Sequence, residues 1–422
     1  MLEQYFVRPQ TVEHIRSSWI GGAVEDYVNW LSEQKYSWKS VTRRVPLVMS
    51  FGQFAQARGA QRLDQLAFYI ESFVDQWLED RARGRRSAIE RRKIADTVRN
   101  PIEQMLSLAL PNFQPQGRSH KQENPFHDSA PAFYDFLRKE KGLREGSLRG
   151  YTHHLRQFAT YLSSIGLTRL SDLSPTVLSA FVTELSSQIG WSSMRNACGV
   201  VRVLLRYLFR QGVLERDLST SIEHPRLYRH SGIPRSISWD QVRLMLEVVD
   251  RRIAVGRRDY AILVLLVTYG LRGREVASLS LDDIDWRDER VRIAERKAGH
   301  FANYPLSPAV GQAILDYLRK GRPETTHRKI FLRSLAPFDP LTASAVSGCA
   351  SRYLRKARIP VPRPGSHTLR HTCVQRLVDA GLSLKIIGDY VGHRSPSSTQ
   401  IYAKVAIEAL REVASSDGEG VL

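Results

Sequence analysis

The stretch GSHTLRHTCVQRLVDAG, residues 365–381, places His367, Arg370 and His371 at the start of an apolar-faced helical pattern. Residues three apart on a helix lie on the same face, so His367 and Arg370 can reach one common group. A metal ion, an acidic side chain and a phosphate are all compatible with such a cluster. The rest of the chain decides between them.

The charge balance of the chain favours the phosphate. Its 422 residues suffice for two or three domains, and 42% hydrophobic with 25% charged residues is typical of a globular protein. The 62 lysines and arginines exceed the 43 aspartates and glutamates, which gives a formal net charge of +19. Such an excess favours a polyanion, most often nucleic acid, because bound phosphates release counterions. A basic protein without such a partner has a similar composition.

The cysteines and the apolar runs indicate the compartment. Cys198, Cys349 and Cys373 are far apart and form no CxxC pair, which disfavours a disulfide framework or zinc ribbon and fits a reducing cytosol. The first residues lack a basic flank followed by an apolar core, so no signal peptide is predicted. The strongest apolar run begins at Ala261 and is too short to cross a bilayer. We therefore expect a cytoplasmic protein with no membrane partner.

Two polar, proline-containing stretches, residues 111–131 and 223–236, read as linkers. They predict an N-terminal helical module (1–115), a linker (116–129), a middle helical module (130–222), a second linker (223–236), a C-terminal domain (237–412) and a tail (413–422).

The first two modules resemble each other weakly. YVNWLSEQKYS in the first parallels FYDFLRKEKGL in the second, and the offset between matching stretches stays between 106 and 108 residues. The matched pairs are Trp30 with Phe136, Leu63 with Leu170 and Phe73 with Phe181. The pattern suggests a duplicated helical module, and a chance likeness between two amphipathic bundles remains the alternative.

The middle module contains two strong helical patterns. SLRGYTHHLRQFATYLSSIG predicts a helix from Ser147 to Gly166. WSSMRNACGVVRVLLRYLFRQG predicts a second helix, with arginines spaced by four or seven residues at positions 195, 202, 206 and 210. This basic stripe would lie along a phosphate backbone or simply form a solvated face.

The C-terminal region mixes helices with a few strands. Ser238 caps one predicted helix, residues 259–269 form a buried helix, and Ser307 with Pro308 starts another. RVRIAERKAGHFANYPLS alternates as a strand, turns near Ala298 and Gly299, and returns as a second strand. We expect a mainly α architecture with one small antiparallel sheet.

Five short motifs follow one another in this region. They are TYGLRGREVASLSLDDIDW with Arg272 and Glu275, RKAGHFANYPL with Lys297, HTLRHT with His367 and Arg370, VGH with His393, and STQIYAKV with Tyr402. In this order and spacing they resemble the tyrosine recombinase family, also called phage-type integrases. The resemblance covers roughly residues 236–410, and a looser match to the family's core-binding domain covers 129–222.

The resemblance implies a helical core-binding module followed by a tyrosine recombinase catalytic domain. It also implies a site-specific recombinase or integrase, such as those of phages, plasmids and other mobile elements, that cuts and rejoins double-stranded DNA. Neither ATP, nor a metal, nor another cofactor is expected. The implied assembly is a homotetramer, or a heterotetramer with related recombinases, on paired DNA sites, with the segment after Tyr402 docking on a neighbouring subunit.

The residue types fit this chemistry. Attack on a phosphodiester gathers negative charge on its non-bridging oxygens, and two guanidiniums, Arg272 and Arg370, can bind them bidentately. Tyr402 would attack phosphorus and form a covalent link. The resemblance places that link on the 3′ phosphate and makes Lys297 the general acid for the leaving 5′-hydroxyl.

His367 and His393 would hold the scissile phosphate and assist proton movement, whereas Glu275 is expected to orient an arginine. A zinc site in this region is disfavoured, because Cys373 points away from His367 on a helix. Tyr390 is interpreted as a packing residue, and an ordinary core tyrosine is the alternative for Tyr402. A type IB topoisomerase-like relaxing enzyme and a non-catalytic DNA-binding protein remain the alternative functions.

Overall fold

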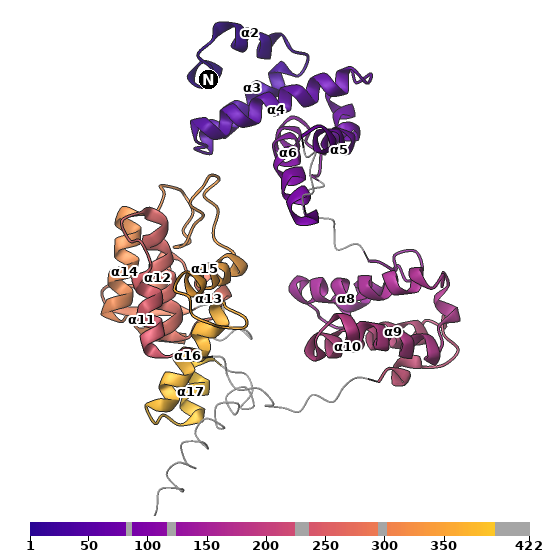
Figure 1. Cartoon of the computed structure of the whole chain (residues 1–422), viewed down its shortest axis with the longest axis vertical. Helices are drawn as coiled ribbons and strands as arrows, with labels where there is room; N and C mark the ends of the chain where they lie inside the picture. The colour runs from indigo at the N-terminus through magenta and orange to yellow at the C-terminus, as the bar shows by residue number, and fades with distance from the viewer. Residues whose placement is uncertain (82–86, 116–123, 224–235, 294–301, 393–422) are drawn as a thin grey trace, which may run out of the picture. The chain divides into compact units, whose positions relative to one another are not determined.

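The computed structural model describes residues 1–81, 87–115, 124–223, 236–293 and 302–392 (Figure 1). The chain divides into two compact units. One contains Met1–Val7, Val28–Arg43 and His230–Leu422, and the other contains Arg8–Tyr27 and Arg44–Arg229. This division runs through two N-terminal helices, so the domain boundaries drawn from the linkers stay a prediction.

All regular secondary structure in the described part of the N-terminal region is helical. Its elements are α1 (Leu2–Tyr5), α2 (Pro9–Ser17), α3 (Gly21–Glu33), α4 (Trp38–Gln56), η1 (Leu63–Tyr69), α5 (Ile70–Arg81) and α6 (Ala88–Ala109). A capping box starts α6: the Ser87 hydroxyl accepts from the Glu90 amide at 3.3 Å, and the Glu90 carboxylate accepts from the Ser87 amide at 3.0 Å.

The middle region forms a compact helical core with residues from Phe126 to Ile222. Its elements are α7 (Phe133–Lys139), α8 (Glu145–Ser164), η2 (Leu170–Asp172), α9 (Pro175–Gln188), α10 (Trp191–Arg210) and η3 (Leu218–Ser221). Helix α10 packs against α8, α9 and η3. Both predicted helices are confirmed, but α8 begins at Glu145 rather than Ser147, because an acidic residue in the first turn is favoured by the helix dipole.

The arginine stripe of α10 is partly structural. Arg202 Nη2 donates to the Ile222 carbonyl at 2.5 Å, and Arg206 Nε donates to the Ser219 hydroxyl at 3.1 Å. Arg195 and Arg210 are exposed. Two of the four arginines therefore brace α10 against η3, and one of these two, Arg206, is also exposed.

The C-terminal region is built around α12. Its helices are α11 (Trp239–Glu247), α12 (Ala254–Tyr269), α13 (Gly273–Ser278), η4 (Leu281–Asp283), α14 (Pro308–Lys320), α15 (Ala343–Lys356), α16 (Ser366–Asp379) and α17 (Leu384–Val391). Helix α12 is buried along most of its length and packs against α11, α13, α14, α15 and α16 (Figure 1). The predicted cap is confirmed, since the Ser238 hydroxyl accepts from the Gln241 amide, and Pro308 opens α14 as expected.

One antiparallel sheet lies in this region, with the strand order β1 (Ile284–Asp285), β2 (Arg290–Ile293) and β3 (Ala302–Pro305). Val291 pairs with Ile284 on one side and with Tyr304 on the other. The two predicted strands are confirmed, and the predicted turn at Ala298 and Gly299 lies outside the described residues. Strand β1 was not predicted, because two residues are too few to show an alternating pattern.

The observed fold class is the predicted one, mainly α with a small antiparallel sheet. Within the described residues, no helix combines the length and apolar character that crossing a membrane requires.

Candidate active site

Arg272 lies where α12 turns into α13. Gly270 ends α12 in the left-handed conformation, with φ at +60°, and a Cβ at this position would lie 3.1 Å from Cys373 Sγ. Arg272 follows two residues later, and the Glu275 carboxylate binds both its guanidinium and its backbone amide. Its Oε1 accepts from Arg272 Nη1, and its Oε2 accepts from the Arg272 amide, each at 2.8 Å. Glu275 is only 1% exposed and orients this arginine, as the sequence suggested.

Arg370 reaches the same place from α16. Its side chain is buried, Nη1 donates to the Gly270 carbonyl at 2.5 Å, and Nη2 donates to the Val391 carbonyl at 2.7 Å. Arg272 Nη2 donates to the next carbonyl, that of Gly392, at 2.9 Å. The two arginines therefore meet at the C-terminal end of α17, on consecutive peptide groups.

His367 stands beside this pair on the first turn of α16. Its residue reaches the surface, yet the protein packed around the ring lowers its pKa by desolvation, and the positive charges of Arg370 and Arg272 lower it further. The imidazole is therefore biased towards the neutral form, which can accept a proton. The structure thus brings together three of the six residues to which the sequence assigned catalytic roles.

The other three, Lys297, His393 and Tyr402, lie outside the described residues. Their described neighbours nevertheless contact each other. The Tyr304 hydroxyl on β3, the strand that follows Lys297, donates to the Tyr390 carbonyl on α17, and the two rings lie 5.0 Å apart. The returning hairpin strand is thereby tied to the helix that precedes His393.

Tyr390 has the packing role expected of it. Its hydroxyl donates to the Thr268 carbonyl on α12 at 3.2 Å. Cys373 is also bound to α12, with Sγ 3.4 Å from the same carbonyl, and burial raises the pKa of its thiol to about 11. A thiol of this kind is a poor metal ligand, because metals bind the thiolate. Among the described residues, no three metal-binding side chains cluster together.

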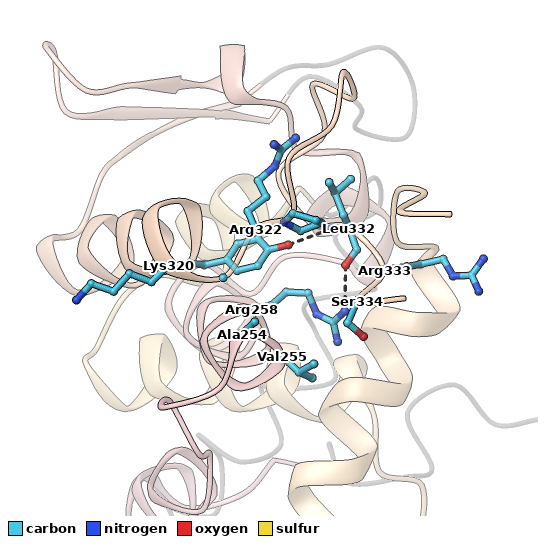
Figure 2. Close-up of a pocket in the computed structure, with 11 residues that line it drawn as sticks. Ala254, Val255, Arg258, Lys320, Arg322, Leu332, Arg333 and Ser334 are labelled. Atoms are coloured by element: carbon cyan, nitrogen blue, oxygen red, sulfur yellow. Dashed lines mark hydrogen bonds between the residues drawn. The ribbon is translucent and has the colours of Figure 1, made fainter. Parts of the chain in front are cut away.

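A second set of buried charges lies at the other end of α12 and was missed in the sequence. Arg258 donates through Nε and Nη2 to Asp259 Oδ1, at 2.9 and 2.7 Å. Its Nη1 donates to the Leu332 carbonyl at 3.0 Å (Figure 2). Arg352 donates to Asp259 Oδ2 at 3.0 Å. An arginine and an aspartate side by side at the start of a buried helix could have signalled this ion pair.

Arg258 and Leu332 border a cavity of about 310 Å³ that Lys320, Arg322 and Arg333 also line (Figure 2). Arg322 donates to the carbonyls of Ile330, Lys329 and His327, at 3.3 and 3.0 Å for the first two. Arg258 and Arg322 therefore brace the loop before α15. The cationic lining of this cavity serves the fold.

Comparison with known proteins identifies the family. The model of the phage integrase family matches residues 235–408, and that of the SAM-like N-terminal domain of phage integrases matches residues 131–212. A Sinorhizobium fredii protein with the provisional name integrase/recombinase y4gC is 41% identical over 184 residues, which span 43% of this chain and 95% of that protein. The chain belongs to the phage integrase family.

Relatives of greater length cover most of this integrase. A second S. fredii protein, provisionally named integrase/recombinase y4rA, is 29% identical over 392 residues, 92% of each chain. The tyrosine recombinase XerC of Pelobacter propionicus is 28% identical over 291 residues, which span 68% of this chain and 94% of XerC. The resemblance to tyrosine recombinases is thereby confirmed.

Solved structures share the fold. The XerH site-specific recombinase, in a post-cleavage complex with palindromic difH substrate, matches 68% of this integrase and 84% of its own chain, with a TM-score of 0.56 and 18% identity. A dimer of λ integrase bound to a COC′ core site matches 64% of this chain and 94% of its own, with a TM-score of 0.51 and 16% identity.

Proposed function

We propose that this integrase is a site-specific recombinase that cuts and rejoins double-stranded DNA, with Tyr402 as the nucleophile. The observation that carries the proposal is the convergence of Arg272, Arg370 and His367 at the end of α17, in a chain of this family. Two residues that stay positively charged at any working pH are what a phosphoryl-transfer site needs.

The reaction balances without an external energy source. The Tyr402 oxygen forms a bond to phosphorus while the bond from phosphorus to the 5′ oxygen breaks, leaving a 3′-phosphotyrosyl link. Tyr402 loses its proton and the leaving 5′-hydroxyl gains one from Lys297. A DNA 5′-hydroxyl then attacks the link and releases Tyr402. The bond energy is conserved, so neither ATP nor a cofactor is required.

Arg272 and Arg370 would stabilise the charge that develops on the non-bridging oxygens. Glu275 and the Gly270 carbonyl fix these two guanidiniums in advance, which lowers the cost of ordering them around the phosphate. His367, with its lowered pKa, would exchange protons with the phosphate or with Tyr402, and His393 would help to hold the phosphate.

The bonds from Arg272 and Arg370 to the Gly392 and Val391 carbonyls add a positioning role. They anchor the peptide groups directly before His393. A change at either arginine would therefore disturb both the binding of phosphate and the start of the segment that carries Tyr402.

The proposed domain organisation follows from this chemistry. Residues 130–222 form the core-binding module and residues 237–412 the catalytic domain, which together hold double-stranded DNA. We propose a tetramer on paired sites, with identical or related subunits, and a cytoplasmic location where such DNA is accessible. The segment AIEALREV after Tyr402, residues 406–413, would contact a neighbouring subunit.

Trapping the covalent complex tests the proposal. The full chain and its Tyr402→Phe variant are incubated with supercoiled DNA that spans the flanks of the gene, quenched with detergent and probed for protein-linked nicks. Tyr390→Phe is the matched control, because that hydroxyl is bound to α12. We expect linkage in the wild type and in the control only. Linkage in Tyr402→Phe would place the nucleophile elsewhere, and relaxation without site preference would favour a topoisomerase.

A further inference from the structure

The N-terminal helices repeat the order of the middle helices. The series α3, α4, η1, α5, α6 matches the series α7, α8, η2, α9, α10, with a 3-10 helix after the second member in both. Each series ends with a long helix of about twenty residues, Ala88–Ala109 in one and Trp191–Arg210 in the other. The weak sequence repeat thus has a counterpart in the arrangement of elements along the chain.

The buried positions of α4 and α8 also correspond. At a spacing of 107 residues, five buried residues of α4 match buried residues of α8. The pairs are Val41 with Leu148, Val45 with Thr152, Val48 with Leu155, Phe51 with Phe158 and Ala55 with Leu162. All ten are buried. Both helices therefore present the same face to their cores.

The turns between the helices share their backbone conformation. Lys35, after α3, and Gly142, after α7, both have φ at +58°. Gly59, after α4, and Gly166, after α8, have φ at +96° and +72°. A lysine is strained in this left-handed region, so composition alone does not account for the shared turn.

An aromatic cluster is reproduced as well. Phe73 of α5 lies edge-on to Phe51 of α4, at 5.4 Å and 65°. Phe181 of α9 lies edge-on to Phe158 of α8, at 4.9 Å and 64°. The third ring is also matched, since Phe54 and Tyr161 contact Phe73 and Phe181 at 5.2 and 5.3 Å. Helix order, turn conformation and ring geometry together exceed what a chance likeness between two bundles would produce.

We infer that residues 21–109 are a second copy of the core-binding module and bind a further segment of double-stranded DNA. The inference rests on the proposed function, because the middle module is the copy to which DNA binding is assigned. The long helices of the two copies locate the surface. Their fifth residues, Arg92 and Arg195, are both exposed arginines, and Arg91 and Lys93 flank the first of them on α6.

The twelfth residues of these helices are arginines too, and both are used inside their own modules. Arg99 donates to both carboxylate oxygens of Glu71, at 3.1 and 2.6 Å, and Arg202 donates to the Ile222 carbonyl. The inner arginine thus braces the helix, whereas the outer basic residues lie on the surface. Three consecutive exposed cations suit the phosphates of DNA, because arginine and lysine side chains make most of the contacts that fix a protein on the duplex backbone.

The test measures the salt dependence of DNA binding by the full chain. The variant Arg91→Gln, Arg92→Gln, Lys93→Gln is compared with a control, Arg8→Gln, Arg16→Gln, Arg62→Gln, that removes equal charge from the same region. The probe is a mixed-sequence DNA duplex long enough to span both modules. The plot of log K against log salt has a negative slope, and each lost phosphate contact reduces its magnitude by about 0.9. We therefore expect the magnitude to fall by about 2 to 3 in the variant and to stay unchanged in the control.

Arg92→Gln alone should lower the slope by about 1 and guards against a folding defect in the triple variant. An unchanged slope, or an equal drop in variant and control, would overturn the inference. A variant that changes only the oligomeric state in sedimentation would assign this surface to a protein partner instead. Covalent linkage is scored separately, so its absence in the wild type would contradict the proposed function while the slope still tests the N-terminal module.

Discussion

The two ends of α12 hold arginines in different ways. At the N-terminal end, Arg258 and Arg352 share one buried carboxylate, Asp259, which accepts from both of them. At the C-terminal end, Glu275 binds Arg272, while Arg370 donates to the neutral carbonyls of Gly270 and Val391.

The difference is clearest between Arg258, which a carboxylate holds, and Arg370, which two carbonyls hold. Arg272 combines both kinds of contact, with the Glu275 carboxylate and the Gly392 carbonyl. A carboxylate cancels much of the charge of a guanidinium, and a carbonyl orients a guanidinium without cancelling its charge. These two carbonyl bonds fix Arg370 in place and leave the charge of its guanidinium intact. Arg258 is fixed in place by a carboxylate whose single charge it shares with Arg352.

The largest expected effect is on Arg370. Arg370→Lys keeps the charge but loses the fork that spans two carbonyls, and it should slow covalent linkage by about 10³-fold. Linkage is measured by detergent-quenched gels on the mapped DNA site. Arg258→Lys is the control at the other end of α12 and should stay near the wild-type rate. A rate for Arg370→Lys within tenfold of the wild type would contradict the catalytic assignment.

The next effect is on stability. Asp259→Asn leaves buried Arg258 without its carboxylate and should lower the free energy of unfolding by about 3 kcal/mol, measured by urea denaturation. Folded protein should still form the covalent link at the wild-type rate. Asp240→Asn, which removes an exposed carboxylate paired with Arg243, should change neither quantity. Loss of linkage in folded Asp259→Asn would mean that the two ends of α12 are not independent.

Tyr304→Phe tests whether a single hydrogen bond near the C-terminal end of α12 matters for covalent linkage. The change removes the hydroxyl that donates to the Tyr390 carbonyl, keeps the ring contact, and should cost about 1 kcal/mol of stability together with a severalfold slower linkage. Tyr317→Phe removes a hydroxyl that accepts from the Leu332 amide near Arg258. It should cost a similar amount of stability and leave linkage unchanged. Equal rates in both variants would show that the tie between β3 and α17 is not used in catalysis.

The smallest expected effect is a shift in titration. His367 should titrate below 6.5 in histidine-ring NMR spectra, and Arg272→Gln should raise its pKa because one of the charges that lower it is gone. A lowered pKa means that the folded state prefers the neutral ring. Its contribution to stability is present above pH 6.5 and is lost as the pH falls from there through the folded pKa. A pKa at or above 6.5 in the wild type would show that burial and the two arginines do not act on His367 as the structure indicates.

Much of the fold could be predicted from short stretches of sequence. Ser238 and Pro308 predict helix starts, because capping and proline preferences act within one turn. Both starts are confirmed. The alternating pattern of β2 is equally local. The start predicted for α8, Ser147, is two residues too late, because serine favours a helix cap while the helix dipole favours Glu145 in the first turn.

The active site could be predicted from the sequence only in part. The order of the motifs pointed to Arg272, His367 and Arg370, and the structure brings these together. Their anchors could not be read from the sequence, because Arg370 bonds to a carbonyl a hundred residues earlier, and backbone carbonyls carry no sequence signature. The same holds for the tie between Tyr304 and Tyr390, which depends on how β3 packs against α17.

The three cysteines have a practical consequence for watching this enzyme at work. Cys198, Cys349 and Cys373 are all buried, and burial raises the pKa of each thiol. Maleimide dyes react with exposed thiolates, so the natural chain should remain almost unlabelled near neutral pH. One cysteine introduced on the surface of α6 and one on α10 would then accept a donor and an acceptor dye. Energy transfer between the dyes would report the distance between the two helical modules as DNA is bound, with every native cysteine left in place.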